Sequence, residues 1–335
     1  MIPLISVIIP NYNGAGTLGP CLRAATSVSN EAVEVIVVDD GSDDDSVEII
    51  KRFPCKLIPL AQHAGASHAR NTGAKHSHGE ILFFTDADCL LQKDTLSWAR
   101  RGLSAADRDV VLGGTYTPQP YDDGFFSRFQ SIFIHYSETK HPLQPDYVAT
   151  HAMVIKAGTF RDSGGFAENM GPILEDVEYS HRLRRSGIAL IMDPALQVQH
   201  IFNFSLLKSL CNAVRKTRYW TLYSLKNGDL FADSGTASLE LKINVATFFI
   251  CLLMLLLAFA LETGTLNLFV GVALLMGANV VFNRRLIKAF YTANGPLFSL
   301  SAALYYLGVY PLAVGVGAFA GVTDYLRLGR STRNT

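Results

Sequence analysis

The chain has 335 residues, 49% of them hydrophobic and 17% charged, and its formal net charge is zero. This length suggests about two domains, and the neutral charge gives no sign of the basic surface that binds nucleic acid. The five cysteines are odd in number and form no C-x-x-C pair, which argues against a disulfide framework and a structural zinc site. Residues 1–240 hold most of the charge, whereas residues 241–320 are mostly apolar.

The first ninety residues alternate between strand and helix patterns. The apolar start lacks a basic segment and a cleavage site, so it predicts a strand and not a signal peptide. Residues 63–73 form a glycine-bearing loop that enters a helix. The alternation predicts an α/β fold with a mostly parallel sheet wound by right-handed crossovers. The expected elements are strands at 4–9, 33–38, 56–60 and 80–85 and helices at 17–28 and 44–53.

Acidic residues follow two of these strands. Asp39 and Asp40 end the second strand, and Asp86 and Asp88 follow the buried run at 80–85. Side chains two residues apart in an extended chain point to the same side, so the latter two carboxylates emerge together. Ligands of open α/β sheets bind at this end of the strands, and adjacent carboxylates repel unless a cation or proton lies between them. The alternative interpretation is a turn or a helix cap.

The pattern weakens after residue 93. The helix that begins near Glu175 and Asp176 carries acids in its first turn, which the helix dipole favours without any catalytic role. His200 follows the last expected strand. The expected elements are helices at 94–106, 125–137 and 174–185 and strands at 110–116, 147–155, 188–192 and 196–198.

Six short motifs occur in a fixed order along this part of the chain. They are Val-Ile-Ile-Pro-Asn-Tyr-Asn (7–13), Val-Val-Asp-Asp-Gly-Ser (37–42), Ala-Arg-Asn-Thr-Gly (69–73), Asp-Ala-Asp (86–88), Gly-Gly-Phe (164–166) and Glu-Asp (175–176). With these motifs, residues 1–225 resemble family 2 glycosyltransferases of the glycosyltransferase-A fold. The resemblance implies a nucleotide-sugar-binding catalytic domain.

The resemblance also implies roles for individual residues. Asp39 and Asp40 would line the nucleotide base pocket, Arg70 would help to hold the nucleotide, and Asp176 would be the catalytic base with Glu175 beside it. The implied metal is Mg²⁺ or Mn²⁺, because hard cations prefer carboxylate oxygens and bridge phosphate oxygens. Its expected ligands are Asp86, Asp88 and, if it is not a solvated or core histidine, His200. Further expected contacts are Pro10, Asn11, Tyr12, Asn13 and Ala87 for the nucleotide sugar and His151 and Lys156 for the acceptor.

Residues 205–225 combine apolar side chains with a basic face. Arg215, Arg218 and Trp220 resemble the Q/R-x-x-R-W motif of processive and lipid-glycosylating members, although Tyr219 stands where tryptophan is expected. The pattern predicts an amphipathic helix at a membrane interface, or alternatively an ordinary surface helix packed on the domain.

Three apolar runs at 243–261, 266–282 and 297–322 predict three transmembrane helices. Basic residues at 284–288 follow the second run, which by the positive-inside rule predicts a cytoplasmic catalytic domain. Three spans then put the basic residues near the C-terminus outside, so a re-entrant or split hairpin is the alternative for the third run. We expect a multi-pass protein of the inner or plasma membrane.

These patterns predict four regions: a catalytic domain (1–202), an amphipathic helix and linker (203–240), a transmembrane region (241–325) and a basic tail (326–335). The expected function is inverting, metal-dependent transfer of a sugar from a UDP- or GDP-linked donor to a hydroxyl of a lipid-linked or membrane-proximal acceptor. This is the chemistry of cell-surface glycan or glycolipid biosynthesis on the cytoplasmic face, with no nucleic-acid partner.

Three other functions are alternatives. A polyprenyl-phosphate glycosyltransferase needs no strong base, because its acceptor phosphate is already ionised, so Asp176 disfavours it. A polymer synthase that also exports its product would need more than three spans to form a channel. A non-enzymatic membrane-anchored nucleotide-binding scaffold would not need Asp88 and Asp176 together.

Overall fold

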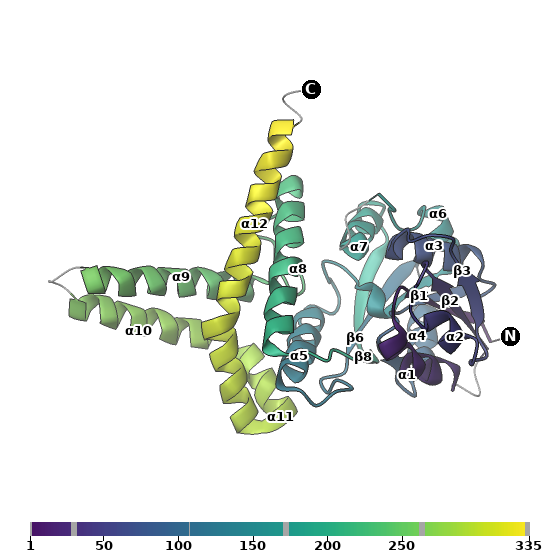
Figure 1. Cartoon of the computed structure of the whole chain (residues 1–335), viewed down its shortest axis with the longest axis horizontal. Helices are drawn as coiled ribbons and strands as arrows, with labels where there is room; N and C mark the ends of the chain where they lie inside the picture. Colours follow the sequence, from purple (N-terminus) through teal and green to yellow (C-terminus); the bar gives the residue numbers. More distant parts are fainter. Residues whose placement is uncertain (1, 28–31, 107, 170–173, 261–264, 332–335) are drawn as a thin grey trace. The chain divides into compact units, whose positions relative to one another are not determined.

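A computed structural model describes residues 2–27, 32–106, 108–169, 174–260 and 265–331 (Figure 1). The chain separates into two compact units. The first comprises Met1–Asp123 and Ser137–Asn203, and the second comprises Gly124–Tyr136 and Phe204–Thr335. Residues 124–136, which the sequence assigns to the catalytic domain, therefore belong to the second unit.

The first unit is built on an eight-stranded sheet with the order β3-β2-β1-β4-β7-β6-β8-β5. Strands β1 to β4 pair in parallel, as the alternation of strands and helices predicts. Strand β7 runs antiparallel to β4 and β6, and β5 runs antiparallel to β8, so the sheet is mixed. The strands are β1 Ile5–Asn11, β2 Val33–Asp39, β3 Lys56–Pro59, β4 Ile81–Phe84, β5 Cys89–Leu91, β6 Val110–Tyr116, β7 Met153–Lys156 and β8 Ala189–His200.

Helices cover this sheet and enclose its apolar strands. All four residues of β4 are buried, which confirms a strand covered on both faces. Phe84 packs in one cluster with Phe160 and Tyr179 from two helices. The helices of this unit are α1 Ala15–Thr26, α2 Ser46–Ile50, α3 Ala66–Lys75, α4 Thr95–Ser104, α6 Ala157–Asp162 and α7 Glu175–Arg185.

Three strand predictions differ from the structure. The strand predicted at 147–155 begins only at Met153, because Thr150–Ala152 form a 3₁₀ turn. The two strands predicted at 188–192 and 196–198 are the single strand β8, whose pairing register with β6 shifts between Met192 and Gln197. The predicted break at 193–195 is thus an irregularity within the strand. Strand β5 was not predicted, since three residues carry no readable periodicity.

The second unit is helical. It contains most of α5 (Phe125–Thr139), then α8 (Leu206–Asn227), α9 (Leu239–Ala260), α10 (Thr265–Phe282), α11 (Arg284–Leu304) and α12 (Tyr310–Ser331). Helices α8 and α12 lie side by side, and α9 and α10 form a hairpin (Figure 1). A Cβ atom on Gly317 would lie 2.5 Å from the Val214 carbonyl oxygen, and one on Gly321 would lie 2.4 Å from that of Arg218. Glycine at these positions therefore lets α12 approach the α8 backbone closely.

The third apolar run is not one straight helix. Asn294 and Gly295 leave the helical conformation just before Pro296, which has no N–H and restricts the residue that precedes it. A π-helical turn, Tyr305–Val309, then separates α11 from α12. The kink thus lies just before the third apolar run (297–322), and the π-helical turn lies within it.

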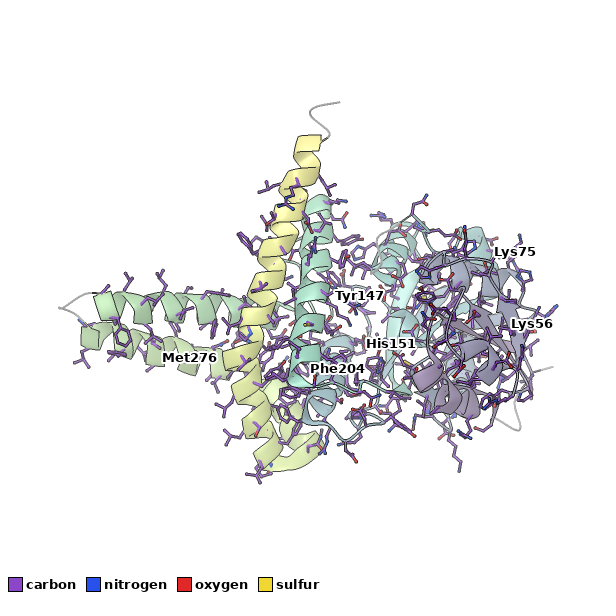
Figure 2. All side chains as sticks on the ribbon, in the orientation of Figure 1. Lys56, Lys75, Tyr147, His151, Phe204 and Met276 are labelled. Carbon is purple, nitrogen blue, oxygen red and sulfur yellow. The ribbon has the colours of Figure 1, made fainter. Side chains whose placement is uncertain are left out.

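Two helical stretches in the described part of the chain are long and apolar enough to cross a membrane, Leu239–Ala260 and Arg284–Leu328. Leu266–Phe282 is apolar but shorter, so the prediction of three spans is supported only in part. Large apolar side chains nevertheless project outward from the α9–α10 hairpin (Figure 2, where Met276 is labelled). Leu256 and Leu274, for example, are 60% and 70% exposed.

Candidate functional site

The carboxyl ends of β1, β2 and β4 meet at one edge of the sheet in the first unit. Asn11 at the end of β1 pairs with Asp39 at the end of β2, and Ile8 pairs with Phe84 of β4. Because these strands are parallel, the residues that follow them gather at the same edge, where α/β sheets bind ligands. Pro10 lies opposite Val38 just inside this edge.

Asp39 and Asp40 are buried at this edge and bind the protein's own loops. The Asp39 carboxylate accepts hydrogen bonds from Asn11 Nδ2 (2.8 Å) and from Ser42 Oγ (2.7 Å) and N (3.1 Å). The two Asp40 oxygens accept from the backbone amides of residues 64 and 65, each at 2.8 Å. Both acids therefore hold the loops at this edge in place. They would shape a nucleotide pocket mainly by positioning these loops.

The exposed part of this edge is aromatic. The Tyr12 ring is 50% exposed and stacks on the His63 ring, with centroids 4.0 Å apart. His63 Nδ1 lies 2.9 Å from Asp40 Oδ2, which orients its ring. Asn13, with a positive φ of 52°, accepts a hydrogen bond from the Asp43 amide at 2.9 Å and so ties the end of β1 to the next loop.

Arg70 of α3 joins two carboxylates that are far apart in the sequence. Its buried guanidinium lies 2.7 Å from Asp86 Oδ1 and 2.7 Å from Glu175 Oε1. Burial opposes ionisation of Asp86, but the Arg70 charge outweighs it and lowers the pKa of this carboxyl. Arg70 thus holds the end of β4 against the start of α7, a different contact from the direct nucleotide contact that the resemblance implies.

Asp88, Cys89 and His200 offer ligand atoms that all lie within 4.8 Å of one another. Strand β5 creates this cluster, because Cys89 pairs directly with His200 across the β5–β8 ladder. His200 Nε2 lies 3.3 Å from Asp88 Oδ2. Of the three expected metal ligands, the structure thus brings Asp88 and His200 together, while Asp86 pairs with Arg70 and Ala87 lies between the two acids.

The donor chemistry of this cluster fits a hard divalent cation. Burial, and then the nearby Asp88 and Asp86, raise the pKa of the Cys89 thiol well above its usual range, and sulfur is a soft donor that Mg²⁺ and Mn²⁺ disfavour. Burial and the Asp86 charge raise the pKa of Asp88 to about 7. A carboxylate and an imidazole remain as donors, a set compatible with Mg²⁺ or Mn²⁺.

Asp176 lies in the first turn of α7, where its Oδ1 accepts a hydrogen bond from the Val177 amide at 2.8 Å. Burial first, and then the charge of Glu175, raise the pKa of Asp176 to about 7, against the opposing charge of Arg70. A carboxyl with this pKa can exchange a proton near neutrality. The preceding Gly171-Pro172 stretch, which the sequence suggests is mobile, lies outside the described residues.

His151, predicted for the acceptor pocket, belongs to a buried network that sequence reasoning missed (labelled in Figure 2). Its Nε2 lies 3.4 Å from Glu138 Oε2, and Glu138 also accepts a hydrogen bond from Thr115 Oγ1 at 2.8 Å. Burial opposes protonation of His151, but Glu138 outweighs it and raises its pKa. Tyr116 stacks on His151 and meets His200 edge-on, which connects this network to the cluster of Asp88 and His200.

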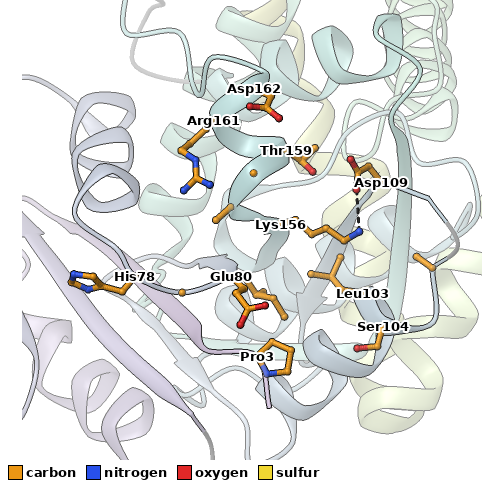
Figure 3. A pocket seen from close by; sticks show the side chains of 15 residues that line it. Pro3, His78, Glu80, Leu103, Ser104, Asp109, Lys156, Thr159, Arg161 and Asp162 are labelled. Atoms are coloured by element: carbon orange, nitrogen blue, oxygen red, sulfur yellow. Dashed lines mark hydrogen bonds and ion pairs between the residues drawn. The ribbon is translucent and has the colours of Figure 1, made fainter. Parts of the chain in front are cut away.

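Lys156 lies at the opposite edge of the sheet. Strand β7 is antiparallel to β4, so Lys156 pairs with Ile81 at the start of β4, away from the acids at its end. Its Nζ lies 3.0 Å from Asp109 Oδ1, inside a polar pocket of about 720 Å³ (Figure 3). The structure therefore does not bring Lys156 to the acidic cluster, and this large pocket lies away from it.

The three residues of the motif at 215–220 belong to α8 in the second unit. Arg215 is exposed, whereas Arg218 Nε lies 2.5 Å from Asp324 Oδ2 of α12. Trp220 lines an apolar cavity. Part of α8 thus packs against α12 within the second unit, which neither the interface-helix prediction nor its alternative specified.

Part of the chain is similar to known glycosyltransferases. Residues 6–162 match the family model described as Glycosyl transferase family 2. Glycosyltransferase AglE of Haloferax volcanii is 30% identical over 201 residues, which cover 56% of this chain and 64% of that protein. Glycosyltransferase GlyG of Streptococcus pneumoniae is 30% identical over 131 residues, 38% of this chain and 44% of that protein. The matches thus span less than two thirds of these curated relatives.

One solved structure extends the likeness in fold. The mannosyltransferase PcManGT from Pyrobaculum calidifontis aligns with 97% of this chain and 88% of its own, at a TM-score of 0.59 and 19% identity. At this identity the likeness establishes a shared fold of the glycosyltransferase-A type.

Proposed function

Because residues 6–162 match the family model described as Glycosyl transferase family 2, we propose that the protein transfers a sugar from a nucleotide-sugar donor to an acceptor hydroxyl, with inversion and with a divalent metal. One observation carries this proposal: the Asp88 carboxylate and the His200 imidazole share the carboxyl edge of the sheet with Asp176, an acid whose pKa is about 7. A non-enzymatic binding scaffold would need the metal-binding pair but no acid that accepts a proton.

Asp88 and His200 would hold the metal. PcManGT is described in complex with GDP-Man and Mn²⁺, which supports this assignment by analogy of fold. When bound, such a cation neutralises the diphosphate that leaves from the sugar. Arg70 pairs with Asp86 next to the proposed metal site. This ion pair holds the Asp86 carboxylate in one position.

Asp176 would accept the proton of the acceptor hydroxyl as it attacks the sugar. A positioned carboxylate base contributes roughly two to four orders of magnitude to the rate. Glu175 cannot share this role easily, because its carboxylate is paired with Arg70. We therefore assign Glu175 to positioning the start of α7, and Asp176 alone to proton transfer.

The exposed Tyr12–His63 pair offers an aromatic face for the base of a UDP- or GDP-linked donor, next to the loops that Asp39 and Asp40 hold. Base–aromatic stacking tolerates different bases, so this surface alone does not select one nucleotide.

The apolar α9–α10 hairpin supports attachment to a membrane, which we propose is the inner or plasma membrane. The basic residues at 284–288 favour the cytoplasmic face for the first unit. An enzyme held at a bilayer meets a lipid-linked acceptor at a high effective concentration. A lipid or lipid-linked glycan is therefore the acceptor class that we propose. Asp176 favours a hydroxyl acceptor over a polyprenyl phosphate, which is already ionised and needs no base.

The test is a screen of nucleotide sugars against the full chain in detergent, with nucleotide release measured with and without EDTA. We expect release from at least one UDP- or GDP-sugar that EDTA abolishes and Mn²⁺ or Mg²⁺ restores. Release that is unaffected by EDTA would overturn the metal role, and binding without any turnover would favour the scaffold.

A further inference from the structure

The second unit contains an apolar cavity of about 330 Å³. Its walls are α8, α12, the first turns of α9 and the connection between α8 and α9, with two residues of α5. Leu241 and Val314 are buried beside it, whereas Phe231 is 83% exposed. The cavity thus has apolar walls and an edge that reaches the surface of the unit.

The spacing of the lining residues gives the cavity its shape. On α12 they are Tyr310, Val314, Ala318 and Val322, each four residues after the last. Such a row follows the helix axis for about 18 Å at 1.5 Å per residue. Helix α8 lines the cavity from Ala213 to Ser224, over about 16 Å. The cavity therefore extends along both helices, and this length suits a hydrocarbon chain.

Two features of the packing keep this space open. The residues that α8 contributes include the short side chains of Ala213, Thr217 and Ser224. On α12, Gly317 and Gly321 contact α8 directly, while the neighbouring row at 314–322 borders the cavity. The walls of this space are largely apolar, so an apolar occupant would bury them and stabilise this unit.

The charged side chains at the cavity indicate which head group the apolar occupant would carry. Lys216 and Lys242 are among the lining residues, and none of the lining residues is acidic. Cations beside an apolar cavity match an amphiphile with an anionic head. We propose that this cavity binds the acyl chain of an anionic phospholipid, with the headgroup at Lys216 and Lys242. The inference concerns the second unit alone and is separate from the proposed transfer reaction.

The experiment uses the full chain in phosphatidylcholine vesicles that contain a phosphatidylglycerol probe with a photoreactive group in its acyl chain. After irradiation, mass spectrometry locates the labelled peptides. We expect label on residues 213–224 and 310–322, in addition to any on the α9–α10 hairpin. A phosphatidylcholine probe should label those two stretches much less. Label confined to the hairpin, or equal label from both probes, would overturn the proposal.

Variants make the test specific. Ala318→Phe should fill the cavity and reduce label at 213–224 several-fold. Ala320 lies on the same helix but does not line the cavity, so Ala320→Phe should leave the label unchanged. Replacing Lys216 and Lys242 by glutamine should reduce phosphatidylglycerol label roughly tenfold or more, and Lys208→Gln on α8 is the matched control.

If Ala318→Phe fails to fold, the lysine variants and the peptide map of the unchanged chain still decide. The experiment measures photolabelling and not sugar transfer, so a negative result would not count against the proposed reaction.

Discussion

Arg70 organises the site at the scale of single residues. One buried guanidinium pairs with acids from β4 and α7, and this contact joins positions 105 residues apart. Buried charges are retained only when they are paired and hydrogen-bonded, so Arg70, Asp86 and Glu175 depend on one another. Around them, Asp88 and Asp176 hold pKa values near 7.

The first prediction concerns the metal ligands. We expect Asp88→Ala to weaken Mn²⁺-dependent nucleotide binding by about a hundredfold or more, since loss of even an outer-shell partner costs about 10–100-fold. Cys89→Ser should change binding little, because sulfur is a soft donor that Mn²⁺ disfavours. Calorimetric titration of nucleotide with and without Mn²⁺ measures both. A Cys89→Ser variant as impaired as Asp88→Ala would contradict the hard-donor assignment.

The second prediction concerns the base. Because the Asp176 pKa is raised to about 7, the carboxyl is protonated and inactive at lower pH, so kcat should rise as pH increases through about 7. Asp176→Asn should lower kcat roughly a hundredfold or more at unchanged donor affinity and remove this rise. The exposed Asp162→Asn is the control. A pH profile that survives in Asp176→Asn would assign the base elsewhere.

Among the elements, the contact of α8 and α12 is set by small residues. The closest approach is at Gly317 and Gly321, and the ion pair of Arg218 and Asp324 follows one turn further along. Small residues that bring two helix backbones together are typical of helix pairs in membranes. This contact uses one face of α8, so the basic amphipathic helix predicted from the sequence is not free on every side.

The third prediction tests this contact. A Cβ on Gly317 would lie 2.5 Å from a backbone oxygen of α8, so Gly317→Ala should destabilise the second unit by about 1–3 kcal/mol. Gly277→Ala on α10, where a Cβ meets nothing within 4 Å, should be neutral or stabilising by up to about 1 kcal/mol. Thermal unfolding in detergent compares them. Equal midpoints for the two variants would show that the contact is not tight.

At the scale of the whole molecule, the unit that contains the candidate site is followed along the chain by an apolar helical unit. The strongest sign of a membrane in the second unit is the hairpin of α9 and α10, whose leucines and phenylalanines project outward (Figure 2). Exposed apolar surface of this extent marks a membrane or protein interaction site.

The fourth prediction follows from that surface. Leu256→Arg and Leu274→Arg together should release the full chain from phospholipid vesicles in a flotation assay, because each arginine costs about 2.5–3.5 kcal/mol within a bilayer. Lys226→Arg, outside the hairpin, should float as the unchanged chain does. Unaltered flotation of the double variant would mean that the hairpin does not enter the bilayer.

The sequence alone determined the features that depend on short-range pattern. Alternating apolar runs and turns predicted the parallel strands β1 to β4, and the acids after β2 and β4 were located correctly at the ends of those strands. These predictions succeeded because burial of a strand and the direction of its side chains follow from neighbouring residues. The long apolar helices were predicted for the same reason, although the kink at Gly295-Pro296 was not.

Only the tertiary structure decided which distant residues meet. Glu138 looks like an ordinary helix acid in the sequence, yet it is buried against His151 because α5 and the turn before β7 converge there. His200 meets Asp88 through β5, and Lys156 is carried to the far edge because β7 runs antiparallel to β4. Strand order and direction are set by pairing between residues that are far apart in the sequence. The local pattern of apolar and polar residues does not reveal which strands pair.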